Sequence, residues 1–436
     1  MSRFQKSSDL FERASKIVPA GVSSNTRARS PHPFYFNRAE GAWAWDVDGN
    51  RHLDIIMGNG AVLLGHGHEA VRTAAAEAMS SGLTCGLESP IAADAIETLL
   101  AAAEWPDMAR FTNTGTEAVQ HALHIARYAT GRTRIAKVEG SYHGWSDEVF
   151  VSVWIDPAKA GPVGDITPLP QFAGQRSDLV AETLVLPFND EKTVAETIDR
   201  HGDDIAAIIL EPTLIDVGFI PGRASFLQAL RDAADRNGIV LVFDELLTGF
   251  NVAVGGAASL CGVKPDLALY GKAIANGLPI AAIAGREDLM RMTEPGKGPA
   301  FVGTFNGHAV SVAAAAAALP ILATGDVQRE MNRRGAQLKE AFNALAAEHG
   351  VPGQMVTGGS HFHWYFCEGA IADFRSAART DADAYRAFTS SLSDSRVLTL
   401  ANPLSHHAIS LGHGDEACEA LVDAFATGLK AVSRSA

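Results

Sequence analysis

Short apolar runs alternate with longer amphipathic stretches through the middle of this chain. Residues 205–210 and 267–270 are almost wholly apolar and are bounded by turn signals, which predicts strands buried on both faces of a parallel sheet. Residues 225–237 instead predict an amphipathic helix, with Ser225 as its N-cap and Gly238 as its stop. The predicted strands end near Phe111, Val138, Glu211, Asp244 and Lys272. The alternation favours an α/β fold with a mainly parallel sheet covered by helices.

The patterns differ towards the two ends of the chain. Residues 40–50 predict a hairpin that turns at Asp48-Gly49 or Gly49-Asn50. The alanine run at 313–318 suits a tightly packed helix, and it is followed by Pro320. Beyond that proline the chain becomes helix-rich and then mixed, with a strand-like segment at 361–366.

These elements predict two domains. A large domain is expected over residues 60–320, where strands and helices alternate. A smaller α+β domain would combine residues 1–59 with residues 321–436.

Composition and charge narrow the class of protein. The chain has 436 residues, of which 47% are hydrophobic and 20% charged, as in a soluble globular protein. Its 50 acidic residues outnumber 36 basic ones, which argues against nucleic acid or an anionic membrane as a partner. The polar N-terminus lacks the apolar core of a signal peptide, and no apolar stretch is long enough to predict a membrane span. A cytoplasmic location is therefore expected.

The cysteines indicate neither a disulfide framework nor a metal site. They are Cys85, Cys261, Cys367 and Cys418. They are widely scattered and form no CxxC pair, so we expect no zinc site and no other bound metal.

An amine and a carboxylate follow two of the predicted strands. Lys272 comes just after the run at 267–270, and Asp244 ends the preceding run. In an open α/β sheet, ligands bind outside the carboxyl ends of the strands, where both side chains would emerge. The pair suits pyridoxal 5'-phosphate (PLP), since the lysine can form a Schiff base and the acid can keep the pyridine nitrogen protonated. Taken singly, Lys272 could be a solvated surface lysine and Asp244 could be a helix cap.

A second motif suits a phosphate group. Thr114, Gly115 and Thr116 precede a helical pattern that extends through Tyr128. Gly115 allows close approach of the backbone, and the two hydroxyls lie beside the free N–H groups of a helix start. An ordinary capping box of Thr114 with Glu117 is compatible with this interpretation.

Three further motifs supply a ring, a carboxylate and a hydroxyl. Tyr142, in the segment Tyr142-His143-Gly144, could stack on a flat cofactor, although it could also be a core aromatic. Glu211 ends another apolar run, and Thr304 precedes an alanine-rich helix.

Together these motifs resemble the class III (fold type I) PLP-dependent aminotransferases. The resemblance covers residues from about 21 to 413. It implies that Lys272 is the catalytic Schiff-base lysine, Asp244 the pyridinium partner and Tyr142 the ring-stacking aromatic. The implied cofactor-binding set also contains Thr114, Gly115, Thr116, His143, Glu211, Asp216 and Thr304. Within it, Asp216 would contact the ring hydroxyl and Thr304 would reach in from the other subunit of a homodimer.

The implied reaction is ping-pong transamination between a small-molecule amino donor and an oxo-acid acceptor. Arg27 lies where the aminomutase-like branch places a carboxylate-binding arginine, although it could also be a surface residue. Many relatives that use α-keto acids carry a second arginine near the C-terminus, but residues 400–411 contain none. His406 and His407 could donate to a substrate there, and because neighbouring strand residues point to opposite sides we expect one of them to face the site.

The segment 58–68 resembles aminotransferases for D-phenylglycine and β-amino acids, and also glutamate-1-semialdehyde aminomutases. The chain departs from the aminomutase pattern at the substrate-binding candidate Asn59 and at Ser405. We therefore favour intermolecular transfer from a carboxylate-bearing β-amino or D-aryl amino acid, with intramolecular aminomutase activity as the alternative. A dinucleotide oxidoreductase is disfavoured because no strand is followed by G-x-G-x-x-G. A catalytically silent cofactor-binding regulator is disfavoured because Lys272 is present.

Overall fold

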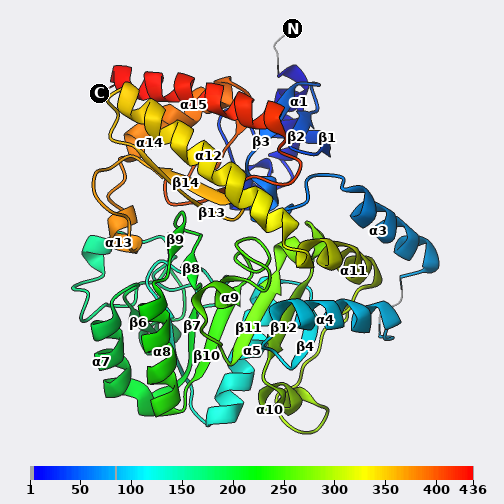
Figure 1. Ribbon diagram of the computed structural model, residues 1–436, viewed down its shortest axis with the longest axis vertical. Helices are drawn as coiled ribbons and strands as arrows, with labels where there is room; N and C mark the ends of the chain where they lie inside the picture. The colour runs from blue at the N-terminus through cyan, green and yellow to red at the C-terminus, as the bar shows by residue number, and fades with distance from the viewer. Residues whose placement is uncertain (1–3, 84–85, 436) are drawn as a thin grey trace.

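A seven-stranded sheet forms the centre of the lower lobe in Figure 1. The computed structural model describes residues 4–83 and 86–435, so Cys85 and residues 1–3 lie outside the described part. In sheet order the strands are β4 (Met108–Thr112), β12 (Ala281–Gly285), β11 (Leu267–Gly271), β10 (Val240–Glu245), β7 (Ile205–Leu210), β5 (Arg134–Val138) and β6 (Leu184–Leu186). Only β12, among these strands, runs antiparallel to its neighbours. The predicted mainly parallel α/β fold is confirmed.

Alternate residues of the central strands face two different cores. In β7, Ala207 and Ile209 pack with the buried face of α5 (Gly115–Thr130), while Ile208 and Leu210 face the opposite core. Because both faces are covered, the strand is apolar at every position. This is why the sequence shows continuous runs rather than alternation.

The remaining helices cover the sheet and build the upper lobe. They are α1 (Gln5–Ala14), α2 (Met57–Gly60), α3 (Glu69–Ser81), α4 (Pro90–Ala103), α6 (Ser177–Glu182), α7 (Glu191–His201), α8 (Ala224–Asn237), α9 (Ala257–Cys261), α10 (Glu287–Met290), α11 (Ala309–Ala323), α12 (Asp326–Glu348), α13 (Phe374–Ala377), α14 (Ala382–Asp394) and α15 (Asp415–Ser435). Short 3₁₀ turns join several of them, among them η5 (Lys272–Ala275).

The predicted helix over 225–237 is α8, but the prediction that Ser225 is its N-cap is wrong. The residue in the N-cap position is Arg223, and Ser225 lies inside the first turn. Its hydroxyl donates to Glu191 Oε1 at 2.6 Å, so the hydroxyl binds α7 instead of capping α8. Gly238 ends the helix with φ +61°, as predicted for a glycine C-cap.

Two small sheets lie in the upper lobe (Figure 1). One contains β1 (Phe36–Glu40), β2 (Trp43–Asp46), β3 (Arg51–Asp54) and β15 (Val397–Leu398); the other contains β13 (Gln354–Gly358), β14 (His361–Tyr365) and β16 (His407–Ala408). The predicted hairpin is the β2–β3 pair, with Gly49 in its turn at φ +90°. The strand-like segment at 361–366 is β14.

The proposed division at residues 60 and 320 stays a prediction. It assigns all seven strands of the large sheet, and the short hairpin β8 (Thr213–Leu214) with β9 (Ile220–Pro221), to the large domain. It assigns the two small sheets to the smaller domain.

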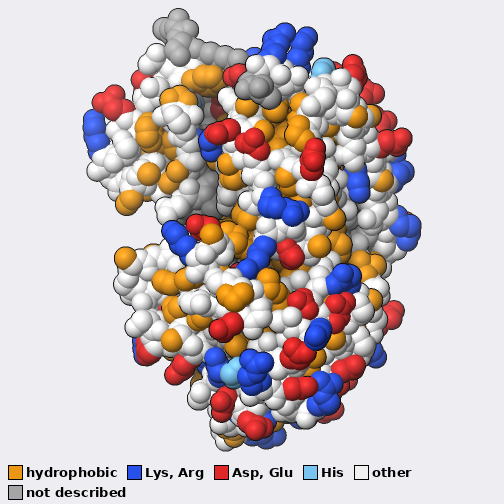
Figure 2. All heavy atoms as spheres, turned by 90° about the vertical axis from the view of Figure 1, so that its left-hand side faces the viewer, with side chains coloured by type: hydrophobic (Ala, Val, Ile, Leu, Met, Phe, Trp, Pro, Cys, Tyr) orange, Lys and Arg blue, Asp and Glu red, His pale blue; other side chains and the backbone are white. Residues whose placement is uncertain are grey.

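The alanine-rich segment forms α11, which continues past Pro320 to Ala323. Within the described residues, no single helix is long and apolar enough to cross a membrane, and α11 with α12 meets that test only as a pair bent by 68°. On the face shown in Figure 2, basic side chains are interspersed with acidic ones over the lower lobe.

Candidate active site

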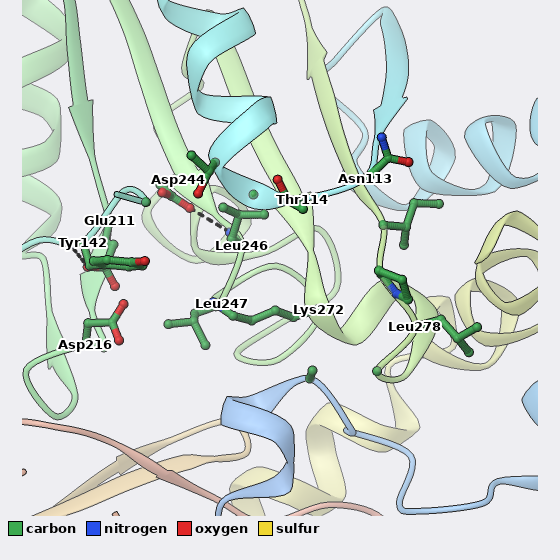
Figure 3. Close-up of a pocket in the computed structure, with 17 residues that line it drawn as sticks. Asn113, Thr114, Tyr142, Glu211, Asp216, Asp244, Leu246, Leu247, Lys272 and Leu278 are labelled. Carbon is green, nitrogen blue, oxygen red and sulfur yellow. Dashed lines mark hydrogen bonds between the residues drawn. The ribbon is translucent and has the colours of Figure 1, made fainter. Parts of the chain in front are cut away.

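A cavity of about 350 Å³ lies where the large sheet meets the α2 turn. Its wall contains the predicted residues Thr114, Gly115, Thr116, Tyr142, Glu211, Asp216, Asp244 and Lys272. Figure 3 shows the Lys272 side chain extending between Leu246 and Leu247 on one side and Leu278 on the other, with Tyr142 and Asp216 across the cavity. The structure thus gathers residues that lie as much as 158 positions apart, from Thr114 to Lys272, around one space.

The amine and the carboxylate come from neighbouring strands, as predicted. Asp244 in β10 pairs with Leu269 in β11, and Lys272 begins the η5 turn that follows β11. Lys272 has φ +48°, in the left-handed region that costs a non-glycine residue about 1–3 kcal/mol. Such strain persists where the surrounding structure enforces it, and it occurs often at functional sites.

Asp244 is held by two hydrogen bonds. Its Oδ2 accepts from His143 Nδ1 at 2.7 Å, and its Oδ1 accepts from the Leu246 backbone N–H at 3.1 Å. The second ring nitrogen of His143 lies 2.9 Å from Ser141 Oγ. Burial lowers the pKa of His143, against the opposing effect of Asp244, so the neutral ring with its proton on Nδ1 fits both contacts. His143 therefore lies behind Asp244, outside the cavity wall.

Glu211 acts on the backbone around the cavity. Its Oε1 accepts from the Tyr142 N–H and its Oε2 from the Ile215 N–H, both at 3.0 Å. Burial and the neighbouring Asp216 raise the pKa of Glu211 well above its usual value, in spite of these two donors. The carboxyl group consequently fixes the loops that carry Tyr142 and Asp216.

Tyr142 is half-buried in the cavity wall and is not a core residue. Its ring lies 5.5 Å from the Trp154 ring at an interplanar angle of 19°, a stacked arrangement. Burial, followed by the charges of Asp216 and Asp244, raises its pKa to about 12, so the phenol is neutral. Trp145, the other aromatic of this loop, is 70% exposed.

The start of α5 can hold an anion. Thr114 and Glu117 form the predicted capping box, with the Thr114 hydroxyl accepting from the Glu117 N–H. A Cβ on Gly115 would lie 2.5 Å from Leu246 Cδ1, and a Cβ on Gly144 would lie 2.5 Å from Thr116 Oγ1. Both glycines are therefore required for the close packing of this cradle, which leaves first-turn N–H groups and the Thr116 hydroxyl for a phosphate.

These residues fit PLP. The cradle suits its phosphate, Tyr142 offers a ring face, and Asp244 and Lys272 provide the carboxylate and the amine that the pyridine nitrogen and the aldehyde require. Within the described part of the chain, no three histidine, cysteine or acidic side chains are grouped so that they could hold a metal ion.

Besides His143, three predicted site residues lie outside the wall of the Lys272 cavity. Arg27 and Asn59 line a second cavity of about 350 Å³ together with Arg29 and His66, and Arg27 is exposed. Thr304 lines a third cavity of about 400 Å³ on the same chain and belongs to the exposed segment 302–305. None of the three is in the wall of the Lys272 cavity.

The sequence analysis missed the apolar part of the wall. Leu246 and Leu247 line the cavity, and Leu246 also packs on Gly115 and Gly271. No chemical pattern marks these leucines, which lie in the turn that directly follows β10. His361, buried near Lys272, was also missed because nothing in its local sequence distinguishes it from a core residue.

Comparison with known proteins agrees with this geometry. The aminotransferase class-III family model matches residues 24–384. The chain is 36% identical to a glutamate-1-semialdehyde 2,1-aminomutase of Methanothermobacter thermautotrophicus, over 96% of this chain and 97% of the relative. Among solved structures, an omega-transaminase from Sphaerobacter thermophilus superposes with a TM-score of 0.93 at 32% identity, covering 99% of this chain and 100% of the other. A β-phenylalanine aminotransferase from Variovorax paradoxus gives a TM-score of 0.85 at 32% identity, with 97% and 93% covered.

The family match spans more than half of the chain and includes every residue of the Lys272 cavity. The predicted fold type I architecture and its cofactor are thereby confirmed. This chain belongs to the class-III aminotransferases, enzymes that use pyridoxal 5'-phosphate.

Proposed function

We propose that this enzyme transfers an amino group from a carboxylate-bearing amino acid to an oxo acid in two successive half-reactions. The observation that carries the proposal is the meeting of Lys272 and Asp244, from adjacent strand ends, in one cavity with a phosphate cradle. A donor must leave as an oxo product before the acceptor enters, so we expect ping-pong kinetics.

Each residue has a role that follows from its position. PLP, when bound, supplies a ring that accepts the charge released at the substrate carbon. Asp244, oriented by its hydrogen bond with His143, would hold the proton of the ring nitrogen. Lys272 Nζ would take the proton from the substrate carbon and return it on the cofactor side, as a general base and then an acid. Tyr142 would cover one ring face, while Thr116 and the α5 N-terminus would bind the phosphate.

We favour a β-amino or D-aryl amino acid as the donor. The β-phenylalanine aminotransferase is 32% identical and similar along nearly its whole length, which supports this class. The departures from the aminomutase pattern at Asn59 and Ser405 also favour intermolecular over intramolecular amino transfer.

Intramolecular amino transfer, of the glutamate-1-semialdehyde aminomutase type, is the second candidate. Curated relatives with that activity are 33–36% identical over at least 96% of this chain. Arg27 and Asn59 also line one cavity, where a carboxylate could be bound.

A single-turnover experiment separates the two candidates. The PLP-loaded enzyme is mixed with L- and D-α-amino acids, β-amino acids, glutamate-1-semialdehyde and simple amines, and the visible spectrum and products are followed. Loss of the PLP absorbance with one equivalent of oxo acid from a β-amino or D-aryl donor supports the proposal. Reaction with the semialdehyde alone, with the amino group moved to the adjacent carbon, would establish the aminomutase instead.

We also propose a cytoplasmic homodimer in which Thr304 serves the partner's cavity. The segment around it exposes Val302 at 75% and Phe305 at 57%, and Leu87 in the same cavity is 73% exposed. A cluster of exposed apolar side chains such as this one is typical of an interface between protein subunits. Light scattering that gives a monomer with full activity and tight PLP binding would contradict this proposal.

A further inference from the structure

Two histidines without a role in the proposed mechanism are buried beneath the Lys272 cavity. His361 begins β14, and His406 immediately precedes β16. Their rings lie 5.1 Å apart at an angle of 82°, and the two residues are 0% and 3% exposed, respectively. Burial lowers the pKa of both rings, and the charge of Lys272 adds a smaller effect on each, so both rings lie near the reacting amine.

Within the described residues, no nitrogen of His361 or His406 makes a hydrogen bond of normal geometry. Burial lowers the pKa of His406, and backbone hydrogen bonding with Asn59 and Ile215 opposes that effect, so backbone groups of both residues approach its ring. A buried polar atom that makes no well-formed hydrogen bond is costly, so the His406 ring would gain from a stronger acceptor beside it.

Asp216 is the complementary group. Its carboxylate lines the cavity, its side chain is 18% exposed, and Oδ1 lies 3.7 Å from His406 Nδ1. That separation is too long for a hydrogen bond. Asp216 also has no side-chain hydrogen bond in the described part of the structure, unlike Glu211 and Asp244 beside it. A small rotation of the Asp216 carboxylate would bring it within hydrogen-bond distance of His406 Nδ1.

We propose that His406 is the positioning residue of Asp216: in the PLP-loaded enzyme, His406 Nδ1–H donates to the Asp216 carboxylate and fixes the oxygen that faces the cofactor. The inference rests on the proposed PLP chemistry and goes beyond it, since it assigns a role to a residue that touches neither PLP nor substrate.

The charge state of the ring agrees with this role. Burial, followed by the charge of Lys272, lowers the pKa of His406 to about 3, so the ring is neutral at physiological pH. A neutral imidazole carries one N–H, and placing it on Nδ1 directs it at the carboxylate. Asp216 then keeps its charge and no proton is transferred between the two groups.

The neighbouring His407 provides a matched control. It lies on the other side of the strand, where its ring stacks on Trp364 at 4.3 Å and its Nε2 accepts from the Leu400 N–H at 3.2 Å. Replacing His407 by leucine changes the same segment and removes a side chain of the same size, but it leaves the surroundings of Asp216 unchanged.

The test compares His406→Leu, His406→Asn and His407→Leu in the full-length protein. Asparagine places an N–H donor near the position of Nδ1, whereas leucine does not. The readouts are the dissociation constant of PLP, from titration of the apoenzyme, and the visible absorption maximum of the loaded enzyme at one pH. We expect His406→Leu to weaken PLP binding about tenfold and shift the maximum, as for a lost hydrogen bond to a charged group. His406→Asn should restore both to near wild type, and His407→Leu should change neither.

A double-mutant cycle with Asp216→Asn shows whether His406→Leu changes PLP affinity through Asp216. If His406 acts through Asp216, His406→Leu has no further effect on PLP affinity in the Asp216→Asn background. An undiminished effect there, or equal losses in His406→Leu and His406→Asn, overturns the proposal. A raised donor KM with unchanged PLP affinity and spectrum would make His406 a substrate contact and would overturn it too. The PLP affinity and the absorption maximum need no substrate, so they are independent of which donor the enzyme uses. Failure of the wild type to bind PLP would instead refute the underlying function.

Discussion

Replacing Gly144 by alanine tests whether the loop after β5 and the start of α5 form one phosphate cradle. Gly144 has φ +92°, where a residue with a Cβ is strained by about 1–2 kcal/mol. The new Cβ would lie 2.5 Å from Thr116 Oγ1 and 3.1 Å from Thr116 Cβ. Either Thr116 or the loop that carries Tyr142 must therefore move.

The expected loss is larger for cofactor binding than for folding. Moving Thr116 removes a hydrogen bond to an anionic group, which contributes about 1.5–3 kcal/mol and corresponds to PLP binding about 10- to 100-fold weaker. Gly131→Ala is the matched control, because Gly131 ends the same helix with φ +70° and a Cβ there would meet nothing within 4 Å. Both variants should lower the apparent Tm of the apoenzyme, since both carry the backbone strain.

The assay pairs thermal unfolding of each apoenzyme with a PLP titration followed by visible absorbance. Only Gly144→Ala should lose PLP affinity. Equal PLP affinities in the two variants, at a similar loss of Tm, would refute the idea that Gly144 and Thr116 pack as one phosphate site.

Three further changes test the remaining groups. Lys272→Ala should retain PLP through the phosphate cradle yet lose nearly all amino transfer in single-turnover experiments; turnover near the wild-type rate would contradict the proposed function. Asp244→Asn should slow the first half-reaction about 100-fold or more, the usual loss for a preorganised charge, and unchanged stopped-flow rates would remove Asp244 from the mechanism. Burial raises the pKa of Asp216 from 3.8 to about 6, so the folded protein holds an extra proton between these values and loses stability as the pH rises through 6. Asp216→Asn should therefore gain about 1–3 kcal/mol over the wild-type apoenzyme between pH 4 and pH 7, visible as a growing Tm difference, and a constant difference would contradict this assignment.

Several parts of the site could be predicted because their signals are local. Thr114 and Glu117 are three residues apart on one helix start, so the capping box follows from spacing alone. Lys272 and Asp244 each follow an apolar run, and parallel strands bring such residues to one edge of a sheet. The Ser225 cap was wrong, since a serine at the start of a helix can be bound elsewhere, here by Glu191 of α7.

Contacts between distant segments could not be predicted in this way. His143 and Asp244 are 101 residues apart, and only the packing of the loop after β5 against β10 brings Nδ1 within 2.7 Å of the carboxylate. The sequence suggested that one of His406 and His407 would face the site, and the structure selects His406 because β16 turns His407 onto Trp364. Arg27 and Asn59, predicted to bind the substrate, line a second cavity, and their role stays a prediction.

The sequence by itself determined the fold class, the cofactor chemistry and the residues at the strand and helix ends, because burial, strand period and helix capping act over a few neighbouring positions. Only the tertiary structure decided which groups contact those residues: the partner of Asp244, the backbone contacts of Glu211, the closeness of Gly144 to Thr116 and the position of His406 beside Asp216. The physical reason is that such distances depend on how whole elements pack, and no short stretch of sequence specifies that packing.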